Sequence, residues 1–257
     1  MDLNLKAKRV LISGGTRGIG RSCAAAFLAE GAHVAIIGRS EASVAAALGD
    51  LPGVIGVAAD LRQETEAAAA LASVERQFGP IDILVNSAGA AQRSLPEDLS
   101  PARWRDAMDA KYFTYIHLID PVIKAMVARR AGVIVNIIGT GGKRPVASHL
   151  PGGAANAALM LATAGLGAAY AASGVRVVGV SPGITNTDRV REAAAVVARG
   201  RGSSVEAVMA ELAAESPTGR FSEPGEIAAA VVFLASDRAP TLTGTIVTMD
   251  GAASAAI

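Results

Sequence analysis

Residues 10–20 read VLISGGTRGIG, and this stretch decides the fold. An apolar run leads into three spaced glycines, Gly14, Gly18 and Gly20, and apolar residues at helical spacing follow them. The order predicts a strand, a tight turn and a helix. Glycines in such a turn let the backbone approach a phosphate, and the helix N-terminus offers free N–H groups and the positive end of its dipole. A tight turn that holds no ligand has the same pattern, so the rest of the chain decides between the two interpretations.

Composition excludes several classes of protein. The chain has 257 residues and a formal net charge of +1, which gives no electrostatic basis for binding nucleic acid or an acidic membrane surface. No linker or charge block divides it, so residues 1–257 are expected to form a single domain. The apolar runs are shorter than the roughly 20 residues that span a bilayer, and the N-terminus has no apolar signal region, so we expect a cytoplasmic protein. Its one cysteine, Cys23, is expected to be a small buried residue of the first helix.

Short apolar runs alternate with helical patterns along the chain. The runs are continuous, which is typical of strands buried on both faces. Strands are expected at residues 10–13, 33–37, 54–58, 81–86, 132–138, 175–180 and 245–249. Helices are expected after the glycines and at residues 63–78, 101–130 with a bend near Pro121, 154–172, 188–214 as two helices, and 224–235. With right-handed crossovers, this order predicts an α/β fold of the Rossmann type, a doubly wound parallel sheet with helices on both faces and its ligand at the carboxyl ends of the strands.

Residues at the predicted strand ends bear on the cofactor. Asp60 follows the third strand, where its carboxylate would accept a hydrogen bond from an adenine amino group, with a helix N-cap as the alternative role. Arg39 ends the second strand, where NAD-binding chains usually carry an acid for the ribose 2′-hydroxyl. Arg39 and Arg17 would instead pair with a 2′-phosphate, which favours NADP(H) over NAD(H); a solvated surface arginine is the alternative for Arg39. Asn86-Ser87-Ala88-Gly89 ends the fourth strand, where a flat ligand could lie against small residues and Asn86 could also brace the central strands.

Together these motifs resemble the short-chain dehydrogenase/reductase family, whose glycine loop reads TGxxxGIG. The resemblance rests on motifs in matching order over almost the whole chain: Ser13-Gly14, Gly18-Ile19-Gly20, Asp60, Asn86-Ser87-Ala88-Gly89, Pro182-Gly183 with Thr187, Gly219-Arg220-Phe221 with Pro224 and Glu226, Thr243-Gly244, and Asp250-Gly251. It implies a sheet of about seven strands in the order 3-2-1-4-5-6-7 and a nicotinamide cofactor. The cofactor-binding residues that it implies are Gly14, Thr16, Arg17, Gly18, Ile19, Gly20, Arg39, Asp60, Leu61, Asn86, Ala88, Gly89, Pro182, Gly183 and Thr187.

The segment 154–169 is small or apolar on every side. A helix without a polar face is buried all round, and one sheet cannot cover every side of a helix in the outer layer. A second subunit is the expected cover, with burial under the chain's own loops as the alternative. The resemblance likewise implies a homodimer or a homotetramer.

The family's chemistry implies four catalytic groups: an Asn that holds a water, a Ser that orients the substrate carbonyl, a Tyr that gives or takes the proton, and a Lys that lowers the pKa of the tyrosine. Spacing from neighbouring motifs places Lys111 at the Asn position and Gly139 at the Ser position. The same spacing places Gly152 at the Tyr position and Asn156 at the Lys position. The resemblance therefore implies a cofactor site beside a degenerate catalytic tetrad.

Four residues could supply part of the missing chemistry: Lys111, Thr140, His149 and Asn156. His149 would be a competent acid or base near neutral pH, although an exposed loop histidine is the alternative interpretation. Thr140 offers a hydroxyl beside Gly139, Lys111 could replace the missing amine, and Asn156 could hydrogen-bond a ribose hydroxyl. The sequence has no metal-ligand cluster and no Ser-His-Asp spacing, so no metal is expected.

Three functions remain open. The first is an NAD(P)(H)-dependent oxidoreductase that acts on a carbonyl or alcohol substrate with a non-standard active site. The second is an inactive NADP(H)-binding protein, such as a sensor or a partner subunit, and the third is a lyase or isomerase that uses the same pocket. Residues 187–220 form the expected substrate lid. Its apolar residues favour an apolar small-molecule substrate or else reflect ordinary packing: Val190, Ala194, Val197, Val208 and Leu212.

Overall fold

The computed structural model describes residues 1–89 and 91–254, and within them seven strands form one sheet in the order β3-β2-β1-β4-β5-β6-β7. The strands are β1 (Arg9–Ser13), β2 (His33–Gly38), β3 (Ile55–Ala58), β4 (Ile83–Asn86), β5 (Gly132–Ile137), β6 (Val175–Pro182) and β7 (Ile246–Met249). Every neighbouring pair is parallel, so the carboxyl ends of the strands lie at one edge of the sheet. The predicted fold class and strand order are therefore confirmed.

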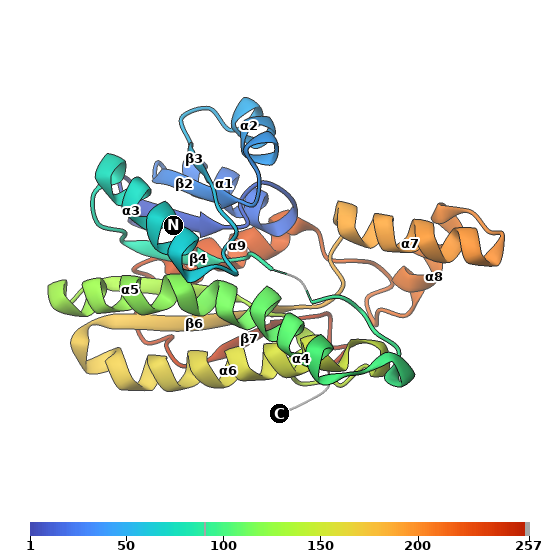
Figure 1. The fold of residues 1–257 in the computed structure, drawn as a ribbon. Helices are drawn as coiled ribbons and strands as arrows, with labels where there is room; N and C mark the ends of the chain where they lie inside the picture. The colour runs from blue at the N-terminus through green and yellow to red at the C-terminus, as the bar shows by residue number, and fades with distance from the viewer. Residues whose placement is uncertain (90, 255–257) are drawn as a thin grey trace.

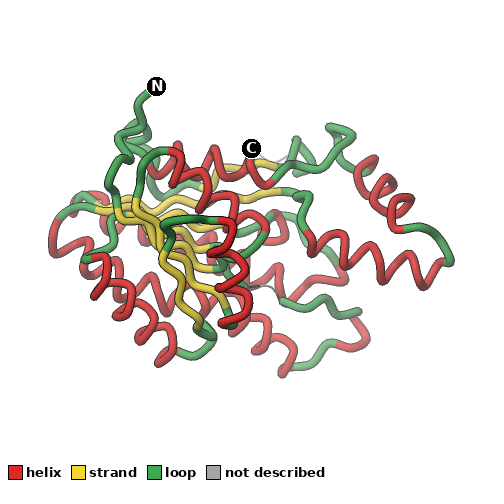
Figure 2. The backbone as a smooth tube through the Cα atoms, turned by 90° about the horizontal axis from the view of Figure 1, so that it is seen from above, coloured by secondary structure: helices red, strands yellow, loops and turns green. Residues whose placement is uncertain are grey.

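Helices cover both faces of the sheet (Figures 1 and 2). One face carries α1 (Gly18–Ala29) and α9 (Pro224–Ala235), and the other carries α3 (Glu64–Phe78), α5 (Thr114–Arg129) and α6 (Leu150–Tyr170). Further helices are α2 (Glu41–Asp50), α4 (Pro101–Ala107), α7 (Asp188–Arg201) and α8 (Val205–Ala214). Two hydrophobic cores result, one on each side of the sheet.

Strand β1 shows why its apolar run is continuous. Val10 and Ile12 are fully buried in the core beneath α1 and α9. Leu11, between them, is fully buried in the opposite core. Because successive side chains of a strand point to opposite faces, a central strand covered on both sides needs apolar residues at every position.

Three helical segments differ from the sequence-based prediction. Helix α2 was not expected; it begins after Ser40, whose hydroxyl caps it by accepting a hydrogen bond from the N–H of Ser43. The segment 101–130 continues through Pro121 and is instead interrupted by a π-helical turn at Met108–Phe113. Helix α6 begins at Leu150, four residues earlier than predicted, because a proline in the first turn is compatible with a helix start.

Helix α6 belongs to a helical segment, Ala147–Ser173, that is long and apolar enough to cross a bilayer by length and composition alone. In the fold it lies against β6 on one face of the sheet, with Leu159 and Thr163 buried. It is therefore one of the helices that cover a face of the β-sheet. Its outward side is apolar, and Leu161 is 77% exposed there.

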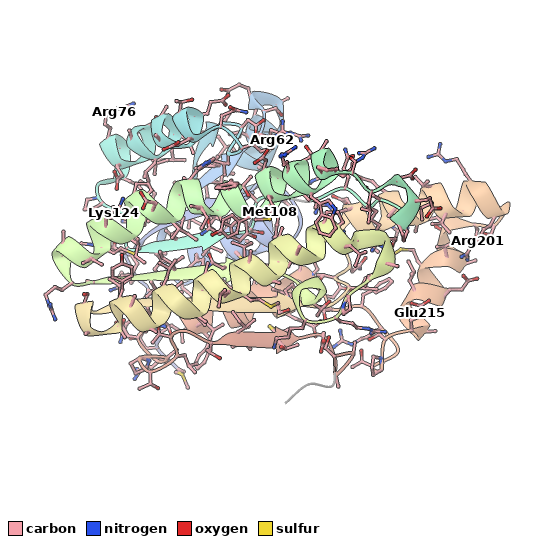
Figure 3. All side chains as sticks on the ribbon, turned by 60° about the horizontal axis from the view of Figure 1, so that its bottom comes forward. Arg62, Arg76, Met108, Lys124, Arg201 and Glu215 are labelled. Carbon is pink, nitrogen blue, oxygen red and sulfur yellow. The ribbon has the colours of Figure 1, made fainter. Side chains whose placement is uncertain are left out.

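Helices α7 and α8 project from the body of the domain, beyond the carboxyl end of β6 (Figure 1). Figure 3 labels Arg201, the last residue of α7, and Glu215, which follows α8. The two helices share a small core in which Ala194 and Val208 are buried, while Val197 is 39% exposed. Packing of α7 on α8 thus accounts for part of the apolar character of this segment, and the apolar substrate stays a prediction.

Candidate active site

The glycine loop between β1 and α1 is tightly folded against its neighbours. A Cβ atom at Gly14 would lie 2.8 Å from the backbone of Ala88, and one at Gly20 would collide with the carbonyl oxygen of Gly14. Beside Gly18, the first residue of α1, the nearest atom to such a Cβ is the Cγ2 of Thr187 at 3.3 Å. No side chain caps α1, so its first N–H groups remain free for an anion, which fits the pyrophosphate of a dinucleotide.

The carboxylate of Asp60 lies beside two arginines at the carboxyl edge. Burial works to raise its pKa, but hydrogen bonds from Arg62 and the charge of Arg39 lower it, so Asp60 is an ionised acceptor. The alternative N-cap role of Asp60 is wrong, because α3 begins at Glu64 and its N-cap residue is Gln63. Arg39 is exposed at the end of β2.

Four further residues of the predicted cofactor set lie near this edge: Leu61, Thr16, Arg17 and Ile19. The carbonyl oxygen of Leu61 lies 2.9 Å from the Nδ1 of His117. Thr16 packs on β2, since a Cβ at Gly38 would lie 2.5 Å from its Cγ2. Arg17 forms an exposed ion pair with Glu192 of α7 at 3.3 Å. Ile19 packs against the core beneath α1.

A buried polar chain crosses the central strands. Ser13 Oγ donates to Asn86 Oδ1 at 3.4 Å, and Asn86 Nδ2 donates to Asn136 Oδ1 at 3.0 Å. Asn136 Nδ2 in turn donates to Thr163 Oγ1 of α6 at 2.9 Å. The bracing role predicted for Asn86 is therefore confirmed, because its amide ties β1, β4 and β5 together.

Close backbone approaches shape the other strand ends. A Cβ at Gly89 would collide with the carbonyl oxygen of Ala110, and one at Gly183 would lie 3.0 Å from the Cα of Asp250. Pro182 ends β6 and is buried. The predicted cofactor residues stand at or after the ends of β1, β2, β3, β4 and β6, whose carboxyl ends lie at one edge of the parallel sheet.

The two glycines at the predicted Ser and Tyr positions differ in their surroundings. Gly139 follows β5 with φ +115°, a conformation that favours glycine, and the nearest atom to its missing Cβ is Asn156 Nδ2 at 3.5 Å. Gly152 lies in the first turn of α6, where a Cβ would collide with the ring of His149 and lie 2.9 Å from the Cβ of Ala91. The imidazole of His149 thus occupies the space that a side chain at position 152 would enter.

His149 and Asn156 each carry a buried polar atom that has no hydrogen-bond partner among the described residues: Nδ1 of His149 and Oδ1 of Asn156. His149 is half-buried at the start of α6, so the alternative of an exposed loop histidine is wrong. Burial, followed by the charges of Arg93 and Lys111, lowers its pKa. Because buried polar atoms are normally paired, these two atoms are polar groups of the site whose hydrogen bonds the described residues leave unmade.

The π-helical turn holds Lys111 inside the site, and Lys111 is buried there. Its Nζ donates to Tyr115 Oη at 2.8 Å and to the carbonyl oxygen of Ile137 at 3.1 Å. Burial, and next the charge of Arg189, lowers the pKa of Lys111 to about 7. Burial raises the pKa of Tyr115, so its hydroxyl stays neutral and donates to Ile137.

Sequence reasoning missed two residues of this cluster. Tyr115 could have been found, because it stands four positions after Lys111 and residues at that spacing share a helix face. Arg189 had no such signal, since its position depends on how α7 folds over the edge. Thr140 begins a short 3₁₀ turn beside Gly139, and its hydroxyl has no hydrogen bond to the described residues.

The structure gives no support to metal or cysteine chemistry within residues 1–89 and 91–254. No three His, Cys, Asp or Glu side chains there are placed to hold a metal ion. Burial raises the pKa of the Cys23 thiol to about 12, which makes it inert, as expected. Two cavities beside Arg176 and Asp237 lie at the amino ends of the strands, away from the glycine loop.

Comparison with known proteins shows similarity over the whole chain. The family model described as enoyl-(acyl carrier protein) reductase matches residues 14–253. The uncharacterized oxidoreductase YvrD of Bacillus subtilis is 33% identical over 98% of both chains. L-sorbose reductase from Gluconobacter frateurii, solved with NADPH and L-sorbose, superposes with a TM-score of 0.95 at 27% identity over all of both chains. A variant of actinorhodin polyketide ketoreductase solved with NADPH gives a TM-score of 0.91 at 29% identity, covering 96% of this chain and 97% of that one.

Proposed function

This chain belongs to the short-chain dehydrogenase/reductase family, and we propose that it interconverts a carbonyl group and an alcohol with NADP(H), using His149 to hold the proton. The observation that carries the proposal is the imidazole of His149 over Gly152, in the space that a side chain at that position would enter. This replaces the tyrosine that the family resemblance implies with an imidazole, a group that can both take and give a proton.

The glycine loop and two arginines support NADP(H) as the cofactor. The uncapped N-terminus of α1 would hold the pyrophosphate, and Arg39 and Arg17 would pair with a 2′-phosphate near Asp60. Two similar structures were solved with NADPH. When bound, the nicotinamide accepts or supplies the hydride.

His149 would handle the proton in both directions. Oxidation of an alcohol removes a hydride from the carbinol carbon and a proton from the hydroxyl, and neutral His149 takes that proton. Carbonyl reduction runs the reverse transfer, with protonated His149 as the donor. Since its pKa is lowered from the usual 6.5, His149 is neutral at pH 7, which favours alcohol oxidation there and reduction at lower pH.

Three polar groups around His149 would position the reactants. The free Oδ1 of Asn156 would accept a hydrogen bond from a hydroxyl of the ribose or the substrate. The hydroxyl of Thr140 would orient the carbonyl beside Gly139. Lys111 acts through its charge, which lowers the pKa of His149, and Tyr115 fixes its amine at 2.8 Å.

The outward face of α6 supports a homodimer or homotetramer. Its exposed positions are apolar or glycine: Ala154, Ala157, Leu161, Gly165, Ala168 and Ala169. Contiguous apolar surface of this kind marks an interface. A second copy of the chain would cover it.

Two measurements test the proposed function. NADPH binding is followed by nucleotide fluorescence, and NADPH oxidation is then measured with a panel of carbonyl compounds in the wild type and in His149→Ala. The proposal expects binding by both proteins and oxidation by the wild type alone. Binding without oxidation of any carbonyl would instead support a cofactor-binding protein, which the glycines at positions 139 and 152 favour as the second candidate.

A further inference from the structure

Two neighbouring residues of the glycine loop contact different parts of the fold. Thr16 lies against the last residue of β2, since a Cβ at Gly38 would be 2.5 Å from its Cγ2. Arg17, one residue on, is the N-cap residue of α1, and its Nη1 donates to Oε1 of Glu192 in α7 at 3.3 Å. The backbone of Arg17 therefore stands beside the end of β2, while its guanidinium is engaged by a carboxylate of the projecting arm.

The contact between Arg17 and Glu192 is a weak, exposed ion pair. The two side chains are 56% and 63% exposed, and a single donor meets a single acceptor. By contrast, the guanidinium of Arg220 meets Glu226 through two hydrogen bonds, at 2.8 and 2.7 Å. Exposed pairs contribute little to stability, because water and salt screen the charges and both side chains lose freedom. A more highly charged anion can therefore take Arg17 from Glu192.

Glu192 carries its negative charge to the place where the proposed cofactor carries its own. In the proposed function the 2′-phosphate lies at the end of β2, where Arg39 is exposed. The start of α7 lies against the glycine loop, with Thr187 Cγ2 at 3.3 Å from a Cβ at Gly18. A phosphate that pairs with Arg17 must displace the carboxylate of Glu192 from the same guanidinium or lie beside it, and like charges repel.

We propose that Glu192 is a specificity-determining residue, which competes with the 2′-phosphate for Arg17 and so limits the preference for NADP(H) over NAD(H). This rests on the proposed function, in which Arg17 pairs with that phosphate. A phosphate monoester carries nearly two negative charges and three acceptor oxygens, so it is a stronger partner for a guanidinium than one carboxylate. On binding NADP(H), Arg17 exchanges Glu192 for the phosphate. NAD(H) lacks the phosphate and leaves the ion pair in place.

The test measures the affinities of the full chain for NADPH and for NADH by fluorescence titration and takes their ratio. The variants are Glu192→Gln, which removes the charge, Glu192→Lys, which reverses it, and Arg17→Gln, alone and combined with Glu192→Gln. The matched control is Glu206→Gln, which removes the same charge from the same arm but from a residue that lies 3.7 Å from Arg191. None of these measurements requires turnover, so they stand apart from the test of the oxidoreductase activity.

Glu192→Gln should bind NADPH roughly two- to fivefold more tightly than the wild type and should bind NADH with unchanged affinity. Glu192→Lys should raise the ratio further. The gain should shrink as salt is added, because salt screens exposed charges, and it should vanish when Arg17→Gln is present. Glu206→Gln should keep the wild-type ratio.

An unchanged ratio in Glu192→Gln overturns the proposal. A lowered ratio also overturns it and shows that Glu192 orients Arg17 toward the phosphate. Equal gains for NADPH and NADH overturn it as well, because they assign the effect to the arm and not to the 2′-phosphate. If Arg17→Gln alone keeps the wild-type ratio, the proposed pairing of Arg17 with the 2′-phosphate fails too. If Arg17→Gln lowers the ratio but Glu192→Gln leaves it unchanged, that pairing stands and the role of Glu192 alone is refuted.

Discussion

Substituting Lys111 with methionine tests the buried amine at the centre of the site. The pKa of Lys111 falls from 10.5 in the unfolded chain to about 7 in the folded one. Between these values the unfolded chain binds more protons, so the free energy of unfolding rises with pH, and below pH 7 the cost of burying the charge is present in full. From these two pKa values, the free energy of unfolding should rise by about 2 kcal/mol between pH 7 and pH 9.

Lys111→Met should abolish this gain without leaving a polar group unpaired. Methionine has a similar length, and Tyr115 still donates its hydroxyl to the carbonyl oxygen of Ile137. The assay is urea unfolding at pH 7, 8 and 9 at one protein concentration, because an oligomer's stability depends on concentration. Lys124→Met, which alters an exposed pair with Asp120, is the control. If the free energies of unfolding of Lys111→Met and the wild type change in parallel with pH, Lys111 is not a buried amine of near-neutral pKa, and the reasoning is refuted.

Three further substitutions probe the geometry of the edge. Gly139→Ser should lower the free energy of unfolding by about 1–3 kcal/mol because φ is +115° there, and an unchanged urea midpoint would argue against that backbone. Gly152→Tyr should destabilise the chain through collision with His149, and combining it with His149→Ala should recover thermal stability; equal melting temperatures of the single and double variants would contradict the contact. Arg39→Ala should weaken NADPH binding by roughly tenfold or more and leave NADH binding unchanged, as measured by fluorescence titration. Equal losses of affinity for both cofactors would show that Arg39 does not pair with the 2′-phosphate.

The fold could be predicted because its main signals are local in sequence. The run 10–13 is buried on both faces. A Cβ at Gly20 would collide with the carbonyl oxygen of Gly14, so the turn itself requires that glycine. Helix α9 was predicted with its observed bounds, Pro224–Ala235, because proline and a capping box of Glu223 and Glu226 mark its start.

The missed elements depend on contacts that sequence periodicity does not encode. The π-helical turn keeps helical spacing on both sides, so nothing in the pattern distinguishes it from a continuous helix, yet it places Lys111 inside the site. Helix α6 begins early enough to bring Gly152 beneath His149, a relation that a predicted loop could not show. Arg189 joins the cluster only because α7 folds back over the glycine loop.

The most direct test of the central claim compares the single-turnover rate of NADPH oxidation in the wild type and in His149→Gln, with a carbonyl compound that the wild type reduces. The rate is measured below neutral pH, where protonated His149 would donate, because burial lowers its pKa. Glutamine retains hydrogen bonding but cannot donate this proton. The affinity for NADPH should stay unchanged, and the rate should fall by roughly 10²- to 10⁴-fold. A variant that oxidises NADPH at the wild-type rate would contradict the assignment of His149 as the proton donor.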